Sequence, residues 1–198
     1  CKNCSSIGKI FRRRIGRLEN SVGMFTVNCV LEPQSQRYID HSVYIVSGED
    51  KIFVNFPWCE ADYALAMDIL MPMDWDAVAR WENTTVGRRG EDYKKFKTET
   101  ANRCIAVAET ALPGIAHHIR GFWTSTPLTY RDYTGTWHGS AFGVKKDCES
   151  PLTTFLSSRT PIDNLRLTGQ NMAIHGIGGV LHAALQTCKD LYIENTKP

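Results

Sequence analysis

A glycine-rich segment near the end of the chain has the residue types that could hold an electron-rich group. Residues 164–168 alternate polar and apolar side chains and are followed by Gly169, which predicts a buried strand and then a tight turn. Glycines in the stretch 176–179 clear the first turn of a helix that continues to Leu185. A bare helix N-terminus offers free N–H donors and a partial positive charge to such a group. A turn that packs a helix on a strand needs the same glycines without a ligand, so the spacing leaves both interpretations open.

Four blocks before this segment resemble, in residues and order, the C-terminal part of a known enzyme family. They are Ser125–Tyr130, Tyr133–Gly135, Gly139–Gly143 and Arg159–Asn164. The family is that of phytoene desaturase, carotenoid isomerase and retinol saturase, flavoproteins of the amine-oxidase-like superfamily. The resemblance implies an FAD-dependent oxidoreductase that desaturates, saturates or isomerises isoprenoid or polyene double bonds.

The same resemblance implies a cofactor site in the glycine-rich segment. Gln170 stands where many relatives have an acidic residue facing the ribityl chain or pyrophosphate; its amide can still bind hydroxyls, or it could simply close the turn. His175 could bind flavin or substrate, or cap the helix. The implied cofactor-binding residues are Gly169, Gln170, Asn171, His175, Gly176, Ile177, Gly178, Gly179 and Val180. No residue is given a catalytic role, because the flavin performs the redox step in such enzymes.

An aromatic stretch ahead of this segment is the candidate substrate wall. Aromatic side chains suit a flat, apolar polyene, and they suit an ordinary protein core equally well. Gly139 and Gly143 within the stretch would allow close approach to a flavin ring. The candidate substrate-binding residues are Tyr130, Tyr133, Trp137, His138 and Phe142.

The dinucleotide-binding motif that this family carries is missing from the sequence. The 198 residues contain no G-x-G-x-x-G motif after a hydrophobic strand. We therefore expect a C-terminal portion of a longer enzyme, either an excised piece or a natural fragment, whose partner is an absent N-terminal FAD-binding half. Alone it would be inactive and would bind FAD weakly or not at all. The alternative is a stand-alone module that binds a hydrophobic small molecule or lipid without redox activity.

Composition and charge narrow the class of protein. With 42% hydrophobic residues, 22% charged residues and a net charge of +2, the chain is typical of a globular protein and not of a nucleic-acid-binding one. The basic cluster Lys9–Arg17 predicts a solvated helix face, with contact to phosphate or a membrane surface as the alternative.

The cysteines indicate a reducing compartment rather than a disulfide framework or a metal site. Seven cysteines include one C-x-x-C pair, Cys1 and Cys4, without a second pair at zinc-ligand distance. Cys29, Cys104 and Cys188 lie on apolar stretches, where a thiol acts as a small hydrophobe. No run of eighteen apolar residues is present. We expect a cytoplasmic protein, with peripheral contact to a membrane as an open alternative.

The periodicity of the chain predicts an α+β fold. A mostly antiparallel substrate-binding sheet with covering helices should occupy residues 1–160, and residues 161–198 should add a returning strand and helix of a Rossmann-like FAD-binding domain. A returning strand and helix without their sheet would expose apolar surface, so we expect a homo-oligomer with residues 160–190 near the contact. The predicted strands are 24–31, 42–47, 51–56, 63–73 and 119–124, and the predicted helices are 9–18, 74–81, 91–112 and 127–133.

Overall fold

The computed structural model describes residues 7–195, so the Cys1–Cys4 pair lies outside the described residues. The chain divides into two compact units. The sheet unit is Val22–Ala141, and the terminal unit combines the two chain ends, Cys1–Ser21 and Phe142–Pro198. Residues 142–160 thus group with 161–198 rather than with the sheet. The assignment of 1–160 to substrate and 161–198 to FAD remains a prediction about function.

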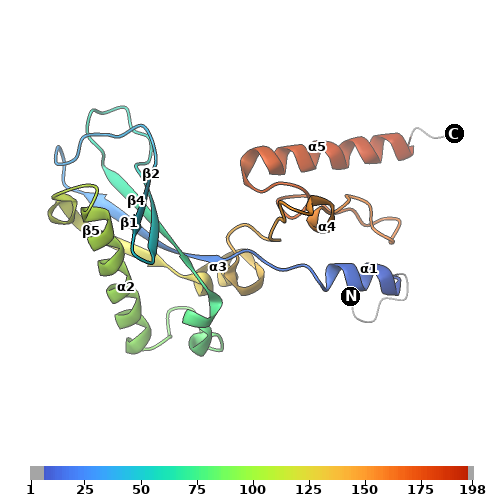
Figure 1. Cartoon of the computed structure of the whole chain (residues 1–198), viewed down its shortest axis with the longest axis horizontal. Coiled ribbons are helices and arrows are strands. Elements are labelled where there is room, and N and C mark those ends of the chain that lie inside the picture. The colour runs from blue at the N-terminus through green and yellow to red at the C-terminus, as the bar shows by residue number, and fades with distance from the viewer. Residues whose placement is uncertain (1–6, 196–198) are drawn as a thin grey trace. The chain divides into compact units, whose positions relative to one another are not determined.

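The sheet unit is built on five antiparallel strands (Figure 1). Their spatial order is β2-β3-β4-β1-β5, which places β1 and β4 in the interior of the sheet. The α+β class and the antiparallel sheet are therefore confirmed. The strands are β1 (Gly23–Leu31), β2 (Val43–Ser47), β3 (Asp50–Asn55), β4 (Ala66–Met73) and β5 (Ile119–Ser125).

One long helix covers one face of this sheet. Helix α2 (Glu91–Glu109) packs against β2, β3 and β4, and Figure 1 shows it lying across the strands. Helix α3 (Pro127–Thr134) follows β5 and begins with a capping box. The Thr126 hydroxyl accepts a hydrogen bond from a backbone N–H of the first turn, and the Thr129 hydroxyl accepts one from the Thr126 N–H. Short 3₁₀ helices complete the unit: Trp75–Ala77, Ala79–Trp81, Ile115–His118 and Trp137–Gly139.

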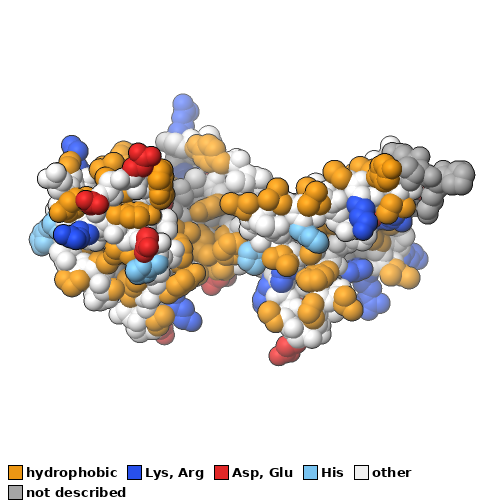
Figure 2. All heavy atoms as spheres, turned by 90° about the horizontal axis from the view of Figure 1, so that it is seen from above, with side chains coloured by type: hydrophobic (Ala, Val, Ile, Leu, Met, Phe, Trp, Pro, Cys, Tyr) orange, Lys and Arg blue, Asp and Glu red, His pale blue; other side chains and the backbone are white. Residues whose placement is uncertain are grey.

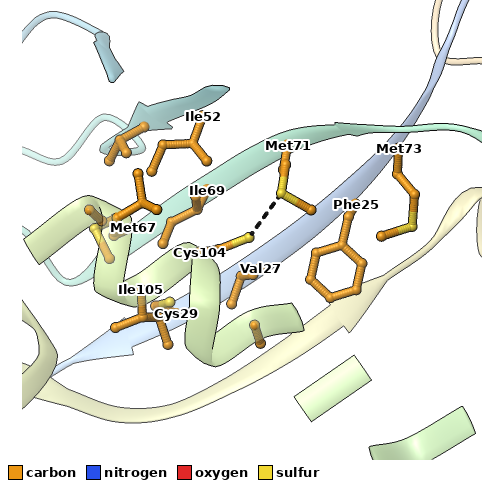
Figure 3. Packing of buried hydrophobic residues seen from close by; sticks show 14 of the residues in the cluster. Phe25, Val27, Cys29, Ile52, Met67, Ile69, Met71, Met73, Cys104 and Ile105 are labelled. Atoms are coloured by element: carbon orange, nitrogen blue, oxygen red, sulfur yellow. Dashed lines mark hydrogen bonds between the residues drawn. The ribbon is translucent and has the colours of Figure 1, made fainter. Parts of the chain in front are cut away.

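The core lies between α2 and the sheet (Figure 3). Alternate β1 residues Phe25, Val27 and Cys29 point toward α2, as the period of two requires. Burial raises the pKa of the Cys29 thiol to about 12 and that of Cys104 to about 11. Both thiols therefore stay protonated and act as small hydrophobes, whereas Cys188 is exposed, contrary to its apolar sequence context.

Two local predictions in the sheet unit are wrong. The expected helix 74–81 is a pair of 3₁₀ helices, and the Asp74 side chain makes no capping bond. Because proline interrupts strands, the sequence predicts that Pro72 bounds the strand 63–73, but β4 continues to Met73. The β3–β4 ladder pairs only 68–70 of β4, so the missing N–H of Pro72 lies beyond that ladder.

The described part of the terminal unit contains three helices, α1 (Lys9–Ile15), α4 (Pro151–Thr154) and α5 (Gly176–Asn195). The predicted buried strand 164–168 is wrong: the segment forms one isolated bridge, Arg159 with Arg166, and Leu165 is exposed. An extended segment becomes a strand only where a neighbouring strand completes its hydrogen bonds. Besides that bridge, the described residues pair the segment with residues 157–160 through the bond from Leu167 N–H to Ser158 O, at 2.8 Å, and no named strand lies beside it. Within residues 7–195, no helix is long and apolar enough to cross a membrane.

A buried ion pair joins two segments of the sheet unit. The guanidinium of Arg89, which is 8% exposed, binds the Asp132 carboxylate. Arg89 also donates to the carbonyl oxygens of Trp81 and Thr84, at 3.2 and 3.1 Å. Its burial therefore comes with partners for both charge and hydrogen-bonding capacity.

Replacing Arg89 should destabilise the sheet unit strongly. Arg89→Met should lower the free energy of unfolding by about 2 kcal/mol, because the carbonyl oxygens of Trp81 and Thr84 would lose a buried charged donor, while Asp132 would keep Arg131 at 2.8 Å. Arg120→Met removes an exposed pair with Glu32, at 3.6 Å, and should cost less than about 1 kcal/mol. Urea unfolding followed by tryptophan fluorescence measures this unit alone, since all five tryptophans lie in 22–141. Equal losses in the two variants would contradict this role of Arg89.

Candidate functional site

The terminal unit brings two groups of predicted site residues together. The ring of Phe142, a candidate substrate residue, lies 4.8 Å from the ring of His175, a candidate cofactor residue. The Asn171 side-chain oxygen accepts from Val144 N–H at 2.8 Å, and the Asn171 carbonyl accepts from Lys146 at 2.8 Å. Segments 142–146 and 170–175 therefore form one cluster around the glycine-rich turn. In this cluster Asn171 already has a structural role.

The glycines of the turn and of the first turn of α5 have different physical causes. Gly169 and Gly176 have φ of +95° and +82°, a left-handed conformation that favours glycine. A Cβ on Gly179 would lie 2.1 Å from the Ile174 carbonyl oxygen, so packing requires that glycine. Gly178 has neither cause: its φ is not positive, and nothing lies within 4 Å of the Cβ position. The free space at Gly178 is not used by the described chain.

Helix α5 buries its polar side and exposes its apolar side. Ala183 and Thr187 are buried, and the Thr187 hydroxyl donates to the Ala183 and Leu167 carbonyl oxygens, at 2.8 and 3.1 Å. Asp190 accepts a hydrogen bond from the Ser158 hydroxyl, which lowers the pKa of that carboxyl. Polar contacts therefore hold the inner face of α5.

The outer face of α5 is an uncovered apolar stripe. Its members repeat at three- and four-residue spacing, which places them on one side of the helix. Figure 2 shows hydrophobic side chains gathered over α5. Ile177, Leu181, Leu185 and Tyr192 are 84%, 60%, 72% and 71% exposed. Contiguous apolar surface of this kind marks a face that another surface covers. We call this set the α5 stripe; its members are Ile177, Leu181, Ala184, Leu185, Cys188, Leu191 and Tyr192.

The other four candidate substrate residues lie in the sheet unit. His138 stacks on Trp75 and on Trp137, with ring centroids 4.7 Å apart in both pairs. The Tyr130 hydroxyl is 2.8 Å from the Thr26 hydroxyl, at the sheet. Tyr133 is 74% exposed. These aromatics are thus surface groups beside the sheet rather than ordinary core.

Gly139 and Gly143 are required by contacts within the chain. A Cβ on Gly139 would lie 1.9 Å from the Pro127 carbonyl oxygen, and a Cβ on Gly143 would lie 2.0 Å from Asn171 Oδ1. Both have positive φ, at +63° and +69°. This corrects the expectation that a flavin ring approaches at these glycines, since the chain's own atoms fill the space.

The face of the sheet opposite α2 is an apolar surface that sequence reasoning missed. Tyr44 and Trp123 on this face are 79% and 67% exposed, and the Tyr44 ring lies 4.9 Å from Phe53. The strand register sets Phe53 beside Leu70, and Leu70 beside Thr26. Tyr130 reaches this face at Thr26. We call this surface the open sheet face; its apolar members are Val30, Tyr44, Val46, Phe53, Leu70 and Trp123.

One polar pair lies within the open sheet face. Asn28 donates to the Asp68 carboxylate at 2.7 Å, and the two residues are directly opposite in the β1–β4 register. Among the described residues, no three His, Cys, Asp or Glu side chains lie together as a metal site would need. Lys51 beside Val46 and Asn55 beside Asp68 are also on this face, so the geometry offers a surface of mixed apolar and polar side chains, and a separate glycine-rich turn.

Comparison of the sequence with known proteins shows which proteins this chain is similar to. No protein-family model matches the sequence. An all-trans-retinol 13,14-reductase of Macaca fascicularis is 28% identical over 207 residues, which covers 88% of this chain and 34% of the relative. Proteins of the same name from Homo sapiens and Danio rerio are 28% and 31% identical over 122 and 111 residues, which covers 60% and 54% of this chain.

The chain spans 34%, 20% and 18% of the lengths of these three relatives. The chain is thus similar in sequence to proteins named all-trans-retinol 13,14-reductase. This similarity agrees with the resemblance of the ordered sequence blocks to the phytoene desaturase, carotenoid isomerase and retinol saturase family.

Proposed function

We propose that this chain is the polyene-binding and flavin-completing part of an FAD-dependent oxidoreductase that acts on isoprenoid double bonds. The observation that carries the proposal is the open sheet face. Water-exposed aromatic and aliphatic side chains on a rigid sheet are costly unless a ligand or another surface covers them. The relatives' printed name refers to reduction at a retinol double bond, and retinol is an apolar polyene.

The open sheet face suits a flat polyene in shape and chemistry. The strands hold the Tyr44, Phe53 and Leu70 side chains in one row across β2, β3 and β4. Rings on a sheet lose little conformational entropy when a ligand binds. The Asn28–Asp68 pair supplies a hydrogen-bonding point for a hydroxyl group at one end of such a ligand. This chain would bind and orient the polyene, and the surface would exclude water from it.

The glycine-rich turn fits a flavin edge. The first turn of the twenty-residue helix α5 contains no acidic residue, so negative charge brought to its N-terminus would meet no repulsion there. Gly178 leaves space that the described chain does not fill. Phe142 and His175 provide adjacent rings beside the turn. Bound there, a flavin would supply hydride chemistry, while residues 169–180 would hold it by backbone N–H groups and polar side chains.

The α5 stripe supports a missing covering domain. An apolar stripe on a helix held by polar contacts is the arrangement expected of a helix between two layers. The segment 164–168 lacks a neighbouring sheet in the same way. We propose that the N-terminal FAD-binding half covers both, and that without it the chain self-associates and lacks activity. The proposal includes a cytoplasmic location with peripheral access to a membrane.

A stand-alone hydrophobic-ligand module is the alternative. The same open sheet face favours it, because polyene binding alone needs no redox cofactor. The two functions differ in their need for flavin. The visible absorption spectrum of the full-length parent, purified without added cofactor, separates them: flavin absorbance supports the oxidoreductase, and a colourless parent that binds retinol supports the module.

Polyene binding to this chain should depend on the open sheet face. All-trans-retinol should quench tryptophan fluorescence of the chain on titration. Trp123→Ala should weaken binding about tenfold, or about 1.4 kcal/mol, because it removes the largest exposed ring of the face. Trp58→Ala is the matched control, since Trp58 is 75% exposed but lies outside the five strands. Retinol binding that is insensitive to Trp123, or equally sensitive to Trp58, would reject the proposed surface.

Flavin binding should separate Gly178 from its neighbours. In the isolated chain, Gly178→Ala should retain or raise stability by up to about 1 kcal/mol, because alanine favours a helix and nothing opposes its Cβ. In the full-length parent, Gly178→Val should strongly reduce flavin retention, because a branched side chain would occupy the proposed flavin edge. Flavin absorbance per protein after gel filtration measures this effect.

The isolated chain should be colourless, since it lacks the pyrophosphate-binding half. Stoichiometric flavin in the isolated chain would contradict the missing-half argument. Unchanged flavin occupancy in the Gly178→Val parent would remove that glycine from the site.

The α5 stripe should drive self-association of the isolated chain. Leu181→Lys with Leu185→Lys should reduce dimer or higher oligomer formation and the binding of a hydrophobic dye, because two charges would enter the stripe. His182→Lys changes an exposed position of the same helix outside the stripe and should leave both unchanged. Light scattering measures the first property and dye fluorescence the second. A strictly monomeric wild-type chain that binds no dye would contradict the proposed missing partner.

A further inference from the structure

We propose that the terminal unit carries a second binding site, in a hollow beside α1, for a ligand that bears phosphate groups. The hollow has a volume of about 1040 Å³. It is lined by α1, the turn after it, and residues 145–154, all within the terminal unit. Five cationic and three acidic side chains line it: Arg13, Arg14, Arg17, Lys145, Lys146, Glu19, Asp147 and Glu149.

Two of the three carboxylates already have partners within the chain. Glu19 is paired with Lys145 at 3.6 Å. The Asp147 carboxylate accepts the backbone N–H groups of Glu149 and Ser150, at 2.9 and 3.1 Å, which orient it without cancelling its charge. Because the five cations outnumber the three carboxylates, the hollow keeps a positive potential despite its mixed lining.

Two of the cations are held in place by neutral partners. Arg14 donates to the carbonyl oxygens of Phe155 and Leu152, at 2.6 and 3.3 Å. Lys146 donates to the carbonyl oxygens of Asn171 and Thr154, at 2.8 and 3.3 Å. Carbonyl oxygens orient these side chains without cancelling their charge. The desolvation that lowers the pKa of Lys146 strengthens its attraction for an anion.

Arg13 and Arg17 are the cations available to a ligand. Within residues 7–195 neither side chain has a hydrogen bond or an ion pair, and both residues are exposed. They are four residues apart and both line the hollow. Guanidinium groups bind phosphate oxygens through two parallel N–H donors, a geometry that an ammonium group cannot offer. Two exposed guanidinium groups therefore line a hollow in which carbonyl oxygens already orient Arg14 and Lys146.

The expected ligand is a phosphate group that carries a substituent, because the volume of the hollow exceeds the volume of one phosphate. Its source is either a soluble diphosphate or the headgroup of an anionic lipid. The inference does not rest on the proposed oxidoreductase function, because no residue of the hollow belongs to the open sheet face or to the α5 stripe.

Titration of the intact chain with inorganic pyrophosphate tests the site by calorimetry. Arg13→Gln with Arg17→Gln should weaken binding at least about tenfold, because two charge-assisted contacts are lost. The control is Arg88→Gln with Lys95→Gln, which removes the same charge from exposed positions of the sheet unit. Sedimentation with vesicles of phosphatidylcholine, with and without phosphatidylglycerol, is the second arm.

Pyrophosphate binding that is lost in the Arg13/Arg17 variant and kept in the control supports the site with a soluble ligand. Binding only to vesicles that contain phosphatidylglycerol, lost in the same variant, supports it with a lipid headgroup. Equal weakening in both variants would show diffuse charge attraction and overturn the proposal, as would binding in neither arm. Circular dichroism of the variants confirms their folding, since both arginines are exposed.

Discussion

A sheet covered by one long helix on one face only is the constraint from which the sheet unit follows. Side chains of β1 alternate between Phe25, Val27 and Cys29 on the α2 side and Thr26, Asn28 and Val30 on the other. The first face is buried in the core that contains residues of α2. The second face keeps exposed rings at Tyr44 and Trp123. Because exposed rings are unfavourable in water, we propose that a ligand or a partner covers this face, and the name of the relatives makes a polyene the first ligand to test.

The terminal unit shows the same logic on a helix. Helix α5 is attached through Thr187 and Asp190, which bond to Leu167 and Ser158. A helix that relied on its own hydrophobic effect would turn Leu181 and Leu185 inward. Attachment by polar groups leaves the apolar side free for a second layer, which is the arrangement that the proposed covering domain requires.

Sequence periodicity predicted most of the sheet but could not predict what the chain lacks. The strands alternate with a period of two, and α2 follows helical spacing, so their types and approximate bounds were accessible. The 164–168 segment has strand-like alternation but no neighbouring strand, and alternation carries no information on whether a partner exists. The open sheet face was missed for a related reason: alternation predicts which residues share a face, but Tyr44 and Ile45 are both apolar and the pattern does not reveal which of them is exposed.

The glycines show how far a candidate site can be inferred from residue type. Gly143 and Gly178 look alike in sequence, and both suggested a space for flavin. In the structure, the Asn171 side chain fills the space beside Gly143, whereas nothing lies within 4 Å of the Cβ position at Gly178. A glycine explained by the chain's own packing needs no ligand. A glycine in a helix costs about 0.5–1 kcal/mol relative to alanine, so one kept without a conformational or packing cause indicates a requirement outside the chain. A substitution at Gly178 is therefore the most direct test of the proposed flavin contact.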